Sequence, residues 1–332
     1  MTTLTTLRAP APKLRLARFR DLTLVPVIVL LLIVGSFADP FFLTGDNLTN
    51  VVQQQSALAL VVLAEALILI SGKFDLSLES IVGMAPAVAV MLVVPTVANG
   101  FGIELPALLA IPLCLLIGAA IGAFNGFLII RFQLSAFIVT LAMLIVVHGL
   151  HLGWSKGKSL FALPESMLYL GSTTWLGLPA AIWIVIVLYA VGIVALRYFR
   201  IGRALYAIGG NADAAKAAGI RVDRVLWGVF IVGGTLAALA GLMESGRLGG
   251  ISANQGVGMI FMVFAAAVIG GVSMDGGKGT IFGALTGVLV IGLVENILSL
   301  VGVAPEWRQL IYGMIILVSL IISRIVGGKA QD

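Results

Sequence analysis

The stretch LPALLAIPLCLLIGAAIGAFNGFLII, residues 105–130, contains no charged side chain. A helix needs about 20 apolar residues to cross the hydrocarbon core of a bilayer, so this stretch predicts a membrane-spanning helix. The whole chain has the same character: 60% of its 332 residues are hydrophobic, 11% are charged and the mean hydropathy is +1.15. A soluble domain carries about 25% charged residues. These values exclude a soluble globular protein and a disordered chain, and the single cysteine, Cys114, excludes a disulfide scaffold.

Further apolar segments lie on both sides of this stretch, and together they predict an all-α polytopic membrane protein of about ten transmembrane helices. Several segments contain Gly or Pro and are candidates for broken or re-entrant helices, so counts of eight to ten remain open. The predicted spans are residues 22–38, 51–71, 80–98, 105–130, 134–153, 179–198, 224–243, 259–273, 280–301 and 308–325.

Ten spans place both termini on one side of the membrane. With the amino terminus inside, all but four of the 20 Lys and Arg residues fall on the inner side. The exceptions are Lys156, Lys158, Arg247 and Arg308. Short loops rich in basic residues stay cytoplasmic, so both termini are predicted to be cytoplasmic. The net charge of +5 therefore reflects topology, and no nucleic-acid partner is expected.

This topology divides the chain into a cytoplasmic basic segment (1–21), a transmembrane domain (22–325) and a cytoplasmic tail (326–332). Two larger connections stand out, one outer, at about 154–178, and one inner, at 197–224. A weak echo between residues 118–125 and 283–287 raises the hypothesis of two pseudo-symmetric halves.

Glycines recur every fourth residue at Gly118, Gly122 and Gly126 and again at Gly283 and Gly287. Ridges of small residues let helix backbones approach closely in a bilayer. We interpret both ridges as tight packing; the alternative is a sliding contact used during transport.

Three acids, Glu65, Glu244 and Glu295, fall inside or at the ends of apolar spans. A carboxylate at that depth costs several kcal/mol unless it faces protein or water. Each is a functional candidate, and a hydrogen-bonded structural acid is an equal alternative.

Catalytic chemistry has no support in the sequence. Residues 276–280, GGKGT, invite comparison with a nucleotide-binding loop, but Val272 and Gly279 occupy positions that require Gly and Ser or Thr. His148 and His151 lack the further ligands that zinc needs. The chain is expected to bind neither metal nor ATP and to be no enzyme itself.

The inner loop 201–220 holds the strongest local pattern. Gly209 and Gly210 predict a turn, Asn211 predicts the cap of a short helix, and Gly219 predicts its end. The helix has small side chains that would let another protein approach. Docking is one interpretation; an ordinary connector at the membrane interface is the other.

The loop resembles the coupling loop of bacterial ABC-importer permeases, of the ribose, xylose and simple-sugar type related to branched-chain amino-acid permeases. Asp213-Ala214-Ala215 followed by Gly219 resembles the EAA-x-x-x-G signature of these permeases. Other blocks agree in order, so the resemblance covers about residues 40–325. The matching blocks are Phe74-Asp75-Leu76-Ser77, Phe124-Asn125-Gly126, Ala136-Phe137-Ile138-Val139-Thr140-Leu141 and the glycine-rich run 267–279.

The resemblance implies a homodimer, or a heterodimer with a related permease, in the bacterial inner membrane. Cytoplasmic ATPase subunits would carry ATP and Mg²⁺, and an extracytoplasmic binding protein would deliver the solute. The expected ATPase-coupling residues are Gly202, Arg203, Gly209, Gly210, Asn211, Asp213, Ala214, Ala215 and Gly219. The candidates for the substrate pathway are Asp75, Ser77, Asn125, Thr140, Glu244 and Asn296.

One departure from the family bears on the solute. Where the family's early motif has small residues, this chain has Lys73 and Glu79, and we expect these opposite charges to compensate each other. The resulting hypothesis is the permease subunit of an ATP-driven importer of a sugar or similar small polar solute. The alternatives are a branched-chain amino-acid permease and an ion-coupled secondary transporter that uses the buried acids.

Overall fold

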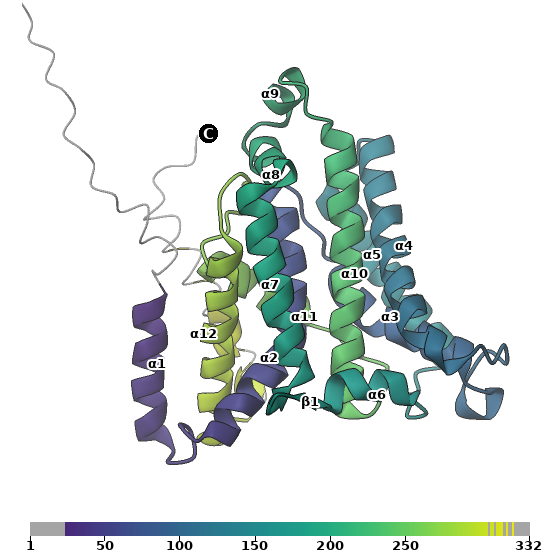
Figure 1. Ribbon diagram of the computed structural model, residues 1–332, viewed down its shortest axis with the longest axis vertical. Helices are drawn as coiled ribbons and strands as arrows, with labels where there is room; N and C mark the ends of the chain where they lie inside the picture. Colours follow the sequence, from purple (N-terminus) through teal and green to yellow (C-terminus); the bar gives the residue numbers. More distant parts are fainter. Residues whose placement is uncertain (1–23, 305, 309, 315–316, 318–320, 322–332) are drawn as a thin grey trace, which may run out of the picture.

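The computed structural model describes residues 24–304, 306–308, 310–314, 317 and 321, and this part of the chain is almost entirely helical (Figure 1). The strands β1 (Thr174–Trp175) and β2 (Leu178–Pro179) form one small antiparallel hairpin. The helices are α1 (Val25–Ala38), α2 (Gly45–Ile70), α3 (Leu78–Val93), the 3-10 turns η3 (Thr96–Ala98) and η4 (Ala107–Leu109), α4 (Ala110–Arg131), α5 (Ala136–Ser155), α6 (Glu165–Ser172), α7 (Ala180–Tyr198), α8 (Arg200–Gly210), α9 (Ala212–Ala217), α10 (Val222–Leu248), α11 (Met259–Ile269) and α12 (Ile281–Leu300).

The fold is the predicted all-α polytopic membrane protein, but its helices are unequal in length. Six are long and apolar enough to cross a bilayer: α2, α4 together with η4, α5, α7, α10 and α12. Three further apolar helices, α1, α3 and α11, are shorter. The tenth predicted span, 308–325, lies largely outside the described residues. The described helices therefore support a multi-spanning fold without establishing ten crossings.

The burial of the helices separates an interior from a periphery. The most apolar window of α2 is 78% buried and that of α10 is 61% buried, whereas the windows of α4, α5 and α7 are only 22% to 28% buried. In water, such wide exposed apolar surfaces would drive aggregation. A hydrocarbon environment removes that penalty, so these outer helices have the surface of lipid-facing spans.

Helix α10 lies at the centre and packs against α2, α3, α4 and α6 (Figure 1). Its contact with α4 is a backbone contact. A Cβ added to Gly118 would collide with the carbonyl oxygen of Gly234, and one added to Gly122 with that of Phe230. The second ridge is packed in the same way, because a Cβ added to Gly283 would collide with the carbonyl oxygen of Gly270. Both glycine ridges are close helix contacts, as the tight-packing interpretation predicted.

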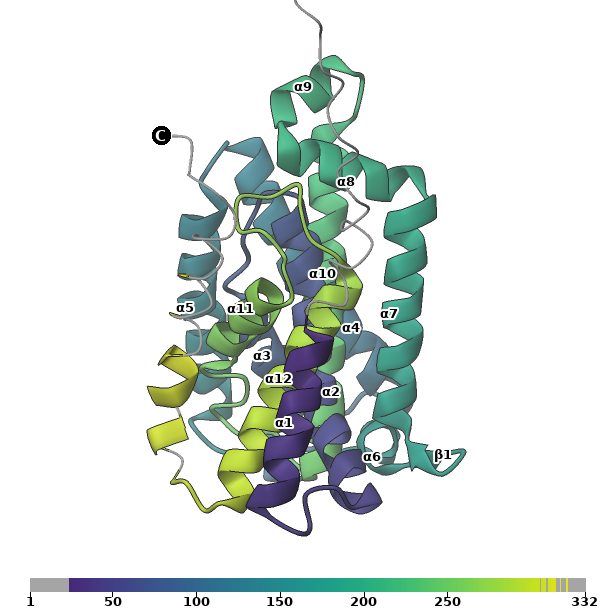
Figure 2. The ribbon, with the colours of Figure 1, turned by 90° about the vertical axis from the view of Figure 1, so that its left-hand side faces the viewer.

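The short helices α3 and α11 begin inside the molecule (Figure 2). The non-helical segment 71–77 leads into α3, and the segment 249–258 leads into α11. The amino-terminal turns of the two helices meet, because Glu79 accepts hydrogen bonds from the backbone amides of Gly258 and Ile260. The order of long, short and long helix thus occurs twice, in α2–α3–α4 and in α10–α11–α12. Helices α2 and α10 run antiparallel, since Ile70 ends α2 beside α8 whereas Gly246 of α10 lies against α6.

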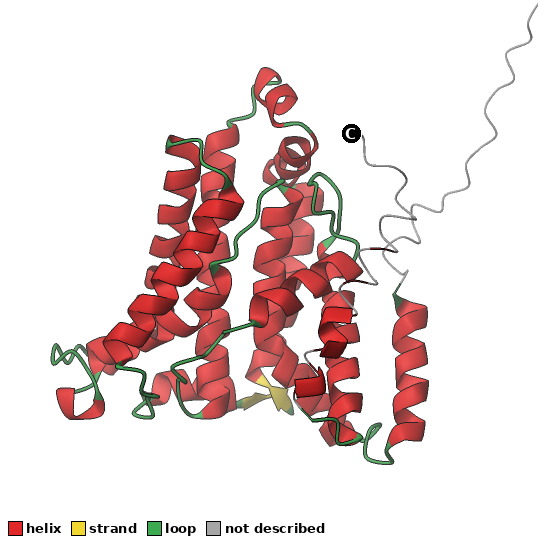
Figure 3. Ribbon diagram, turned by 180° about the vertical axis from the view of Figure 1, so that it is seen from behind, coloured by secondary structure: helices red, strands yellow, loops and turns green. Residues whose placement is uncertain are grey.

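The two predicted larger connections lie at opposite ends of the molecule. Helices α8 and α9 form one end, while α6 and the β1–β2 hairpin belong to the other (Figures 1 and 3). Asn211 caps α9 as predicted, because its Oδ1 accepts from the amide of Ala214 at 2.8 Å. Gly219, at φ +83°, follows the end of that helix. The predicted turn at Gly209 and Gly210 is wrong: both residues are the last turn of α8.

Candidate functional site

Helix α9 presents an exposed surface of small side chains at its end of the molecule. Asp213, Ala214 and Gly219 are exposed, as are Ala212 and Ala217 on the same helix. Ala215 is different. It is only 4% exposed and packs against Ile208 of α8 and Leu226 of α10. Ala215 was expected to contact a partner protein. In the structure its side chain holds α9 onto the protein and faces away from the exposed surface.

Helix α8 is joined to two other segments by backbone contacts. Gly209 touches the carbonyl of Ile70 at the end of α2, and the amide of Gly277 donates to the same carbonyl at 2.9 Å. The hydroxyl of Tyr206 donates to the carbonyl of Gly279 at 2.8 Å. Helix α8 is therefore in direct contact with the start of segment 71–77 and with the loop that connects α11 with α12.

The remaining expected coupling residues take different positions on α8. Gly202 is buried against the carbonyl of Leu196, so a larger side chain there would disturb the bend between α7 and α8. Arg203 is exposed, and its guanidinium donates to the carbonyl of Tyr198 at 3.4 Å. Gly210 is exposed, with open space around it.

Four of the six pathway candidates come together as one buried polar cluster. Asp75 Oδ1 accepts from the amide and the hydroxyl of Ser77 at 2.9 and 2.6 Å, and Asn125 Nδ2 donates to Ser77 Oγ at 2.7 Å. Thr140 Oγ1 accepts from the amide of Leu76 at 3.1 Å. All four side chains are fully buried. Non-helical backbone inside a membrane protein needs such partners, and this cluster supplies them to segment 71–77.

Glu65 adjoins the cluster from α2. Its Oε1 accepts from the amide of Asp75 at 3.4 Å, while its Oε2 and the Oδ1 of Asn125 have no hydrogen-bond partner within the described part of the chain. The cluster does not line the cavity described next. Its hydrogen bonds join α2, α4, α5 and segment 71–77 to one another. Its part in a solute pathway stays a prediction.

Glu79 is not compensated by Lys73, contrary to the sequence expectation. Its Oε2 accepts from the amides of Gly258 and Ile260, both at 3.1 Å, across the junction of α3 and α11. The first amides of a helix lack partners within the helix and favour a negative charge. Glu79 therefore stabilises the beginning of α11. The sequence around Glu79 could not predict this role, because its hydrogen-bond partners lie far along the chain.

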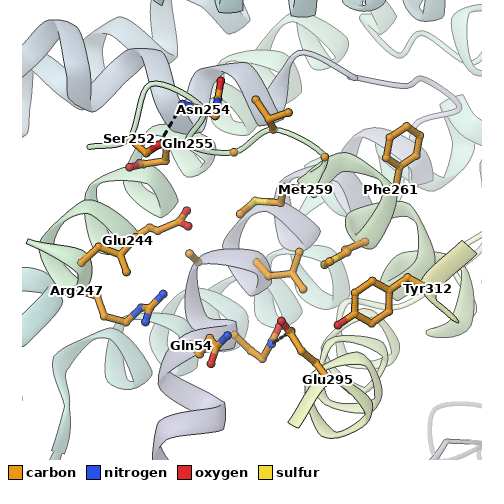
Figure 4. Close-up of a pocket in the computed structure, with 18 of the residues that line it drawn as sticks. Gln54, Glu244, Arg247, Ser252, Asn254, Gln255, Met259, Phe261, Glu295 and Tyr312 are labelled. Atoms are coloured by element: carbon orange, nitrogen blue, oxygen red, sulfur yellow. Dashed lines mark hydrogen bonds between the residues drawn. The ribbon is translucent and has the colours of Figure 1, made fainter. Parts of the chain in front are cut away.

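A cavity of about 710 Å³ lies between α2, α10, the segment 252–258, α11, α12 and residues 312–313 (Figure 4). Glu244 is the pathway candidate that lines it. Its polar lining consists of Gln54, Gln55, Glu244, Arg247, Ser252, Asn254, Gln255, Glu295 and Tyr312. A space of this size with a few convergent polar groups is typical of small-molecule sites.

Two of these polar groups are fixed by the protein itself. Gln255 Nε2 donates to the carbonyls of Val82 and Gly241 at 3.0 and 3.1 Å and to Ser245 Oγ at 2.9 Å, so it anchors the segment before α11 to α3 and α10. Gln55 Nε2 donates to Glu295 Oε2 at 2.8 Å. The wall of the cavity is preorganised at these points.

Most of the lining was missed from the sequence, although one signal was present. Residues 53–55 are three consecutive glutamines near the start of the predicted span 51–71, and polar side chains at such a position indicate a cavity or a polar contact. Arg247, Asn254 and Tyr312 carried no comparable signal. Asn296, the last pathway candidate, lies beside the cavity wall and exchanges amide hydrogen bonds with Asn47 at 2.9 and 3.0 Å.

Comparison with known proteins gives consistent matches over nearly the whole chain. Residues 47–320 match the family described as the permease component of the branched-chain amino acid transport system. The ribose import permease protein RbsC of Haemophilus influenzae is 32% identical over 312 residues, which cover 91% of this chain and 92% of that protein. RbsC of Escherichia coli K12 is 33% identical over 304 residues, covering 90% and 92%.

A relative with another named solute is similarly close. The autoinducer 2 import system permease protein LsrC of Escherichia coli (strain K12 / DH10B) is 31% identical over 302 residues, which cover 91% of this chain and 86% of that protein. No solved structure matches the chain.

Proposed function

Since the chain belongs to the family of permease components of branched-chain amino acid transport systems, we propose that it is the membrane-spanning permease subunit of an ATP-driven importer for a sugar or a similar small polar solute. The observation that carries the proposal is the similarity to ribose import permeases over about nine tenths of both chains. The multi-spanning helical fold, with a polar cavity at its interior, suits that role.

The energy for transport would come from partner subunits. ATP and Mg²⁺ would be bound by two ABC ATPase subunits that dock on α8 and α9, whose exposed small side chains permit close approach. Closure of the ATPases would move α8, and the backbone contacts of Gly209 and Gly277 with Ile70 would pass this movement to the short helices. An extracytoplasmic binding protein would deliver solute at the opposite end, near α6.

The proposed assembly is a dimer of permeases, either two copies of this chain or this chain with a related one, in the bacterial inner membrane. About ten segments would lie in the membrane: the six long helices, the shorter α1, α3 and α11, and residues 308–325. The sets α2–α3–α4 and α10–α11–α12 would be inverted halves. Transporters often build their midplane sites from such repeats with broken helices.

The proposal has two alternatives, one with a different solute and one with a different energy source. The family description names branched-chain amino acids, and the buried acids Glu65 and Glu244 would serve an ion-coupled carrier. Sugar is favoured because the relatives at 32% and 33% identity are ribose import permeases.

Reconstitution with the ATPase and binding-protein partners is expected to give ATP-dependent uptake of a radiolabelled pentose into proteoliposomes. The matched control uses an ATPase whose hydrolysis is blocked, and a second control imposes proton and sodium gradients without ATP. Uptake of leucine in place of any sugar would favour the amino-acid alternative, and uptake driven by a gradient alone would favour the secondary carrier.

The proposed orientation predicts the accessibility of two positions at opposite ends, the partly exposed Ser159 and the exposed Lys216. In a Cys114→Ala background, Ser159→Cys should react with an impermeant thiol reagent in intact cells, and Lys216→Cys only after permeabilisation, because basic loops such as that of α9 stay cytoplasmic. The permease is expressed alone, so that no ATPase shields α9. The reverse labelling pattern would contradict the orientation.

A further inference from the structure

We propose that the cavity of about 710 Å³ is a solute-binding site of the permease itself and that it accepts an uncharged polyhydroxylated molecule of the size of a monosaccharide. The inference rests on the proposed function, and it adds that the permease contributes selectivity of its own after the binding protein has delivered the solute.

Two residues that line the cavity carry polar atoms without partners. Oε2 of Glu244 and the hydroxyl of Tyr312 are both buried, and neither has a hydrogen-bond partner among the residues that the structure describes. Buried polar atoms are almost always hydrogen-bonded, and leaving one unpaired is unfavourable. A ligand hydroxyl, which both donates and accepts, supplies what a carboxylate oxygen and a phenol lack.

These two groups are placed to hold one molecule between them. In Figure 4 the carboxyl group of Glu244 extends from α10, and the ring of Tyr312 reaches inward from the opposite wall. Gln54 of α2 and Asn254 of the segment before α11 are exposed amides on the same lining, each able to donate and to accept. Several donor–acceptor groups that converge from different elements match a ring of hydroxyls.

The charge balance of the cavity argues against a ligand of net negative charge. Glu244 and Glu295 contribute two carboxylates, and among the described lining residues Arg247 alone carries a guanidinium or ammonium group. A ligand carboxylate would face a net negative surface, and like charges brought together are unfavourable. Apolar side chains such as Leu58 and Met259 complete the lining and suit the C–H faces of a sugar ring.

Protection of a reporter cysteine measures occupation of the cavity. Leu248 lines it, is 56% exposed and makes no polar contact through its side chain. The variant Leu248→Cys, in a Cys114→Ala background, is prepared as the permease–ATPase complex in lipid nanodiscs without binding protein. The rate of thiol labelling is then followed against D-ribose, D-xylose, D-galactose, L-leucine and L-valine. Ser159→Cys, at a partly exposed position outside the cavity, is the control.

At least one aldose should slow labelling of Leu248→Cys in a saturable manner, with no effect on Ser159→Cys. Adding Glu244→Gln or Tyr312→Phe should raise the half-protecting concentration about five- to tenfold, as expected for a lost hydrogen bond to a charged or buried group. Glu165→Gln and Tyr169→Phe, both exposed on α6 and outside the lining, should leave it unchanged.

The inference is overturned if no aldose slows labelling, if leucine or valine protects better than every aldose, or if the control substitutions weaken protection as much as Glu244→Gln does. A failure of the proposed function appears separately, as aldose protection without ATP-dependent uptake in the complete importer. If a cavity variant does not fold, the protection measured with Leu248→Cys alone still decides the proposal.

Discussion

Ala214→Trp is expected to abolish coupling between the ATPase and the solute pathway while the permease still inserts and folds. Ala214 is exposed on α9, so a large ring there would extend into the space that a docked partner needs. Solute-stimulated ATP hydrolysis and uptake should fall together by about tenfold or more, which corresponds to roughly 1.4 kcal/mol of lost docking free energy. Co-purification with the ATPase and assays in proteoliposomes measure both effects.

The matched control is Ala162→Trp, which adds the same ring to an exposed position of the outer segment. It should leave ATPase binding and hydrolysis unchanged. Ala215→Trp is no substitute for this test: Ala215 is buried against Ile208 and Leu226, so a ring there would detach α9 from the protein. Normal ATPase binding and normal uptake by Ala214→Trp would show that α9 is a connector at the membrane interface and no docking surface.

Gly234→Ala should strongly destabilise the folded permease. A Cβ at Gly234 would collide with the carbonyl oxygen of Gly118, and neither backbone can move away without separating α10 from α4. Overpacking of a tight interior costs about 1–3 kcal/mol and can cost more, which is a large part of a typical folding free energy of about 5–15 kcal/mol. Thermal denaturation of the detergent-solubilised protein, together with the yield of monodisperse material, measures the loss.

Gly228→Ala is the matched control on the same helix, since nothing lies within 4 Å of the added methyl group there. It should be neutral or slightly stabilising, because alanine favours a helix over glycine by about 1 kcal/mol. Equal melting temperatures of the two variants would mean that α4 and α10 are free to separate, and the glycine ridge would then belong to a sliding contact instead of a rigid one.

Local features of this protein could be predicted because they depend on adjacent residues. The apolar stretch 105–130 predicts a span, since the thickness of a bilayer sets the number of apolar residues required. Asn211 and Gly219 delimit α9, since a cap and a left-handed residue act within one helical turn. The spacing of Gly118 and Gly122 predicts one smooth helix face.

The same local reasoning was wrong where a tertiary contact competed with it. Gly209 and Gly210 read as a turn, yet α8 continues through both, and Gly209 lies directly against the carbonyl of Ile70. There an interaction with a distant segment outweighed the preference of the chain itself. Ala215, expected among the coupling contacts, is buried by a hydrophobic contact with α8 and α10, and its part in coupling stays a prediction.

Hydropathy, helix caps and family motifs depend on contiguous residues, so they were sufficient to identify this protein as a polytopic α-helical permease. The contacts of Glu79 with the beginning of α11, and the meeting of Glu244 and Tyr312 on one cavity, arise from the packing of distant segments. The partners of Glu79 lie more than 170 positions along the chain, and no local periodicity encodes such a distance. Which polar groups meet inside the bilayer depends on how closely the helices pack and on where α3 and α11 begin, and those are properties of the assembled fold.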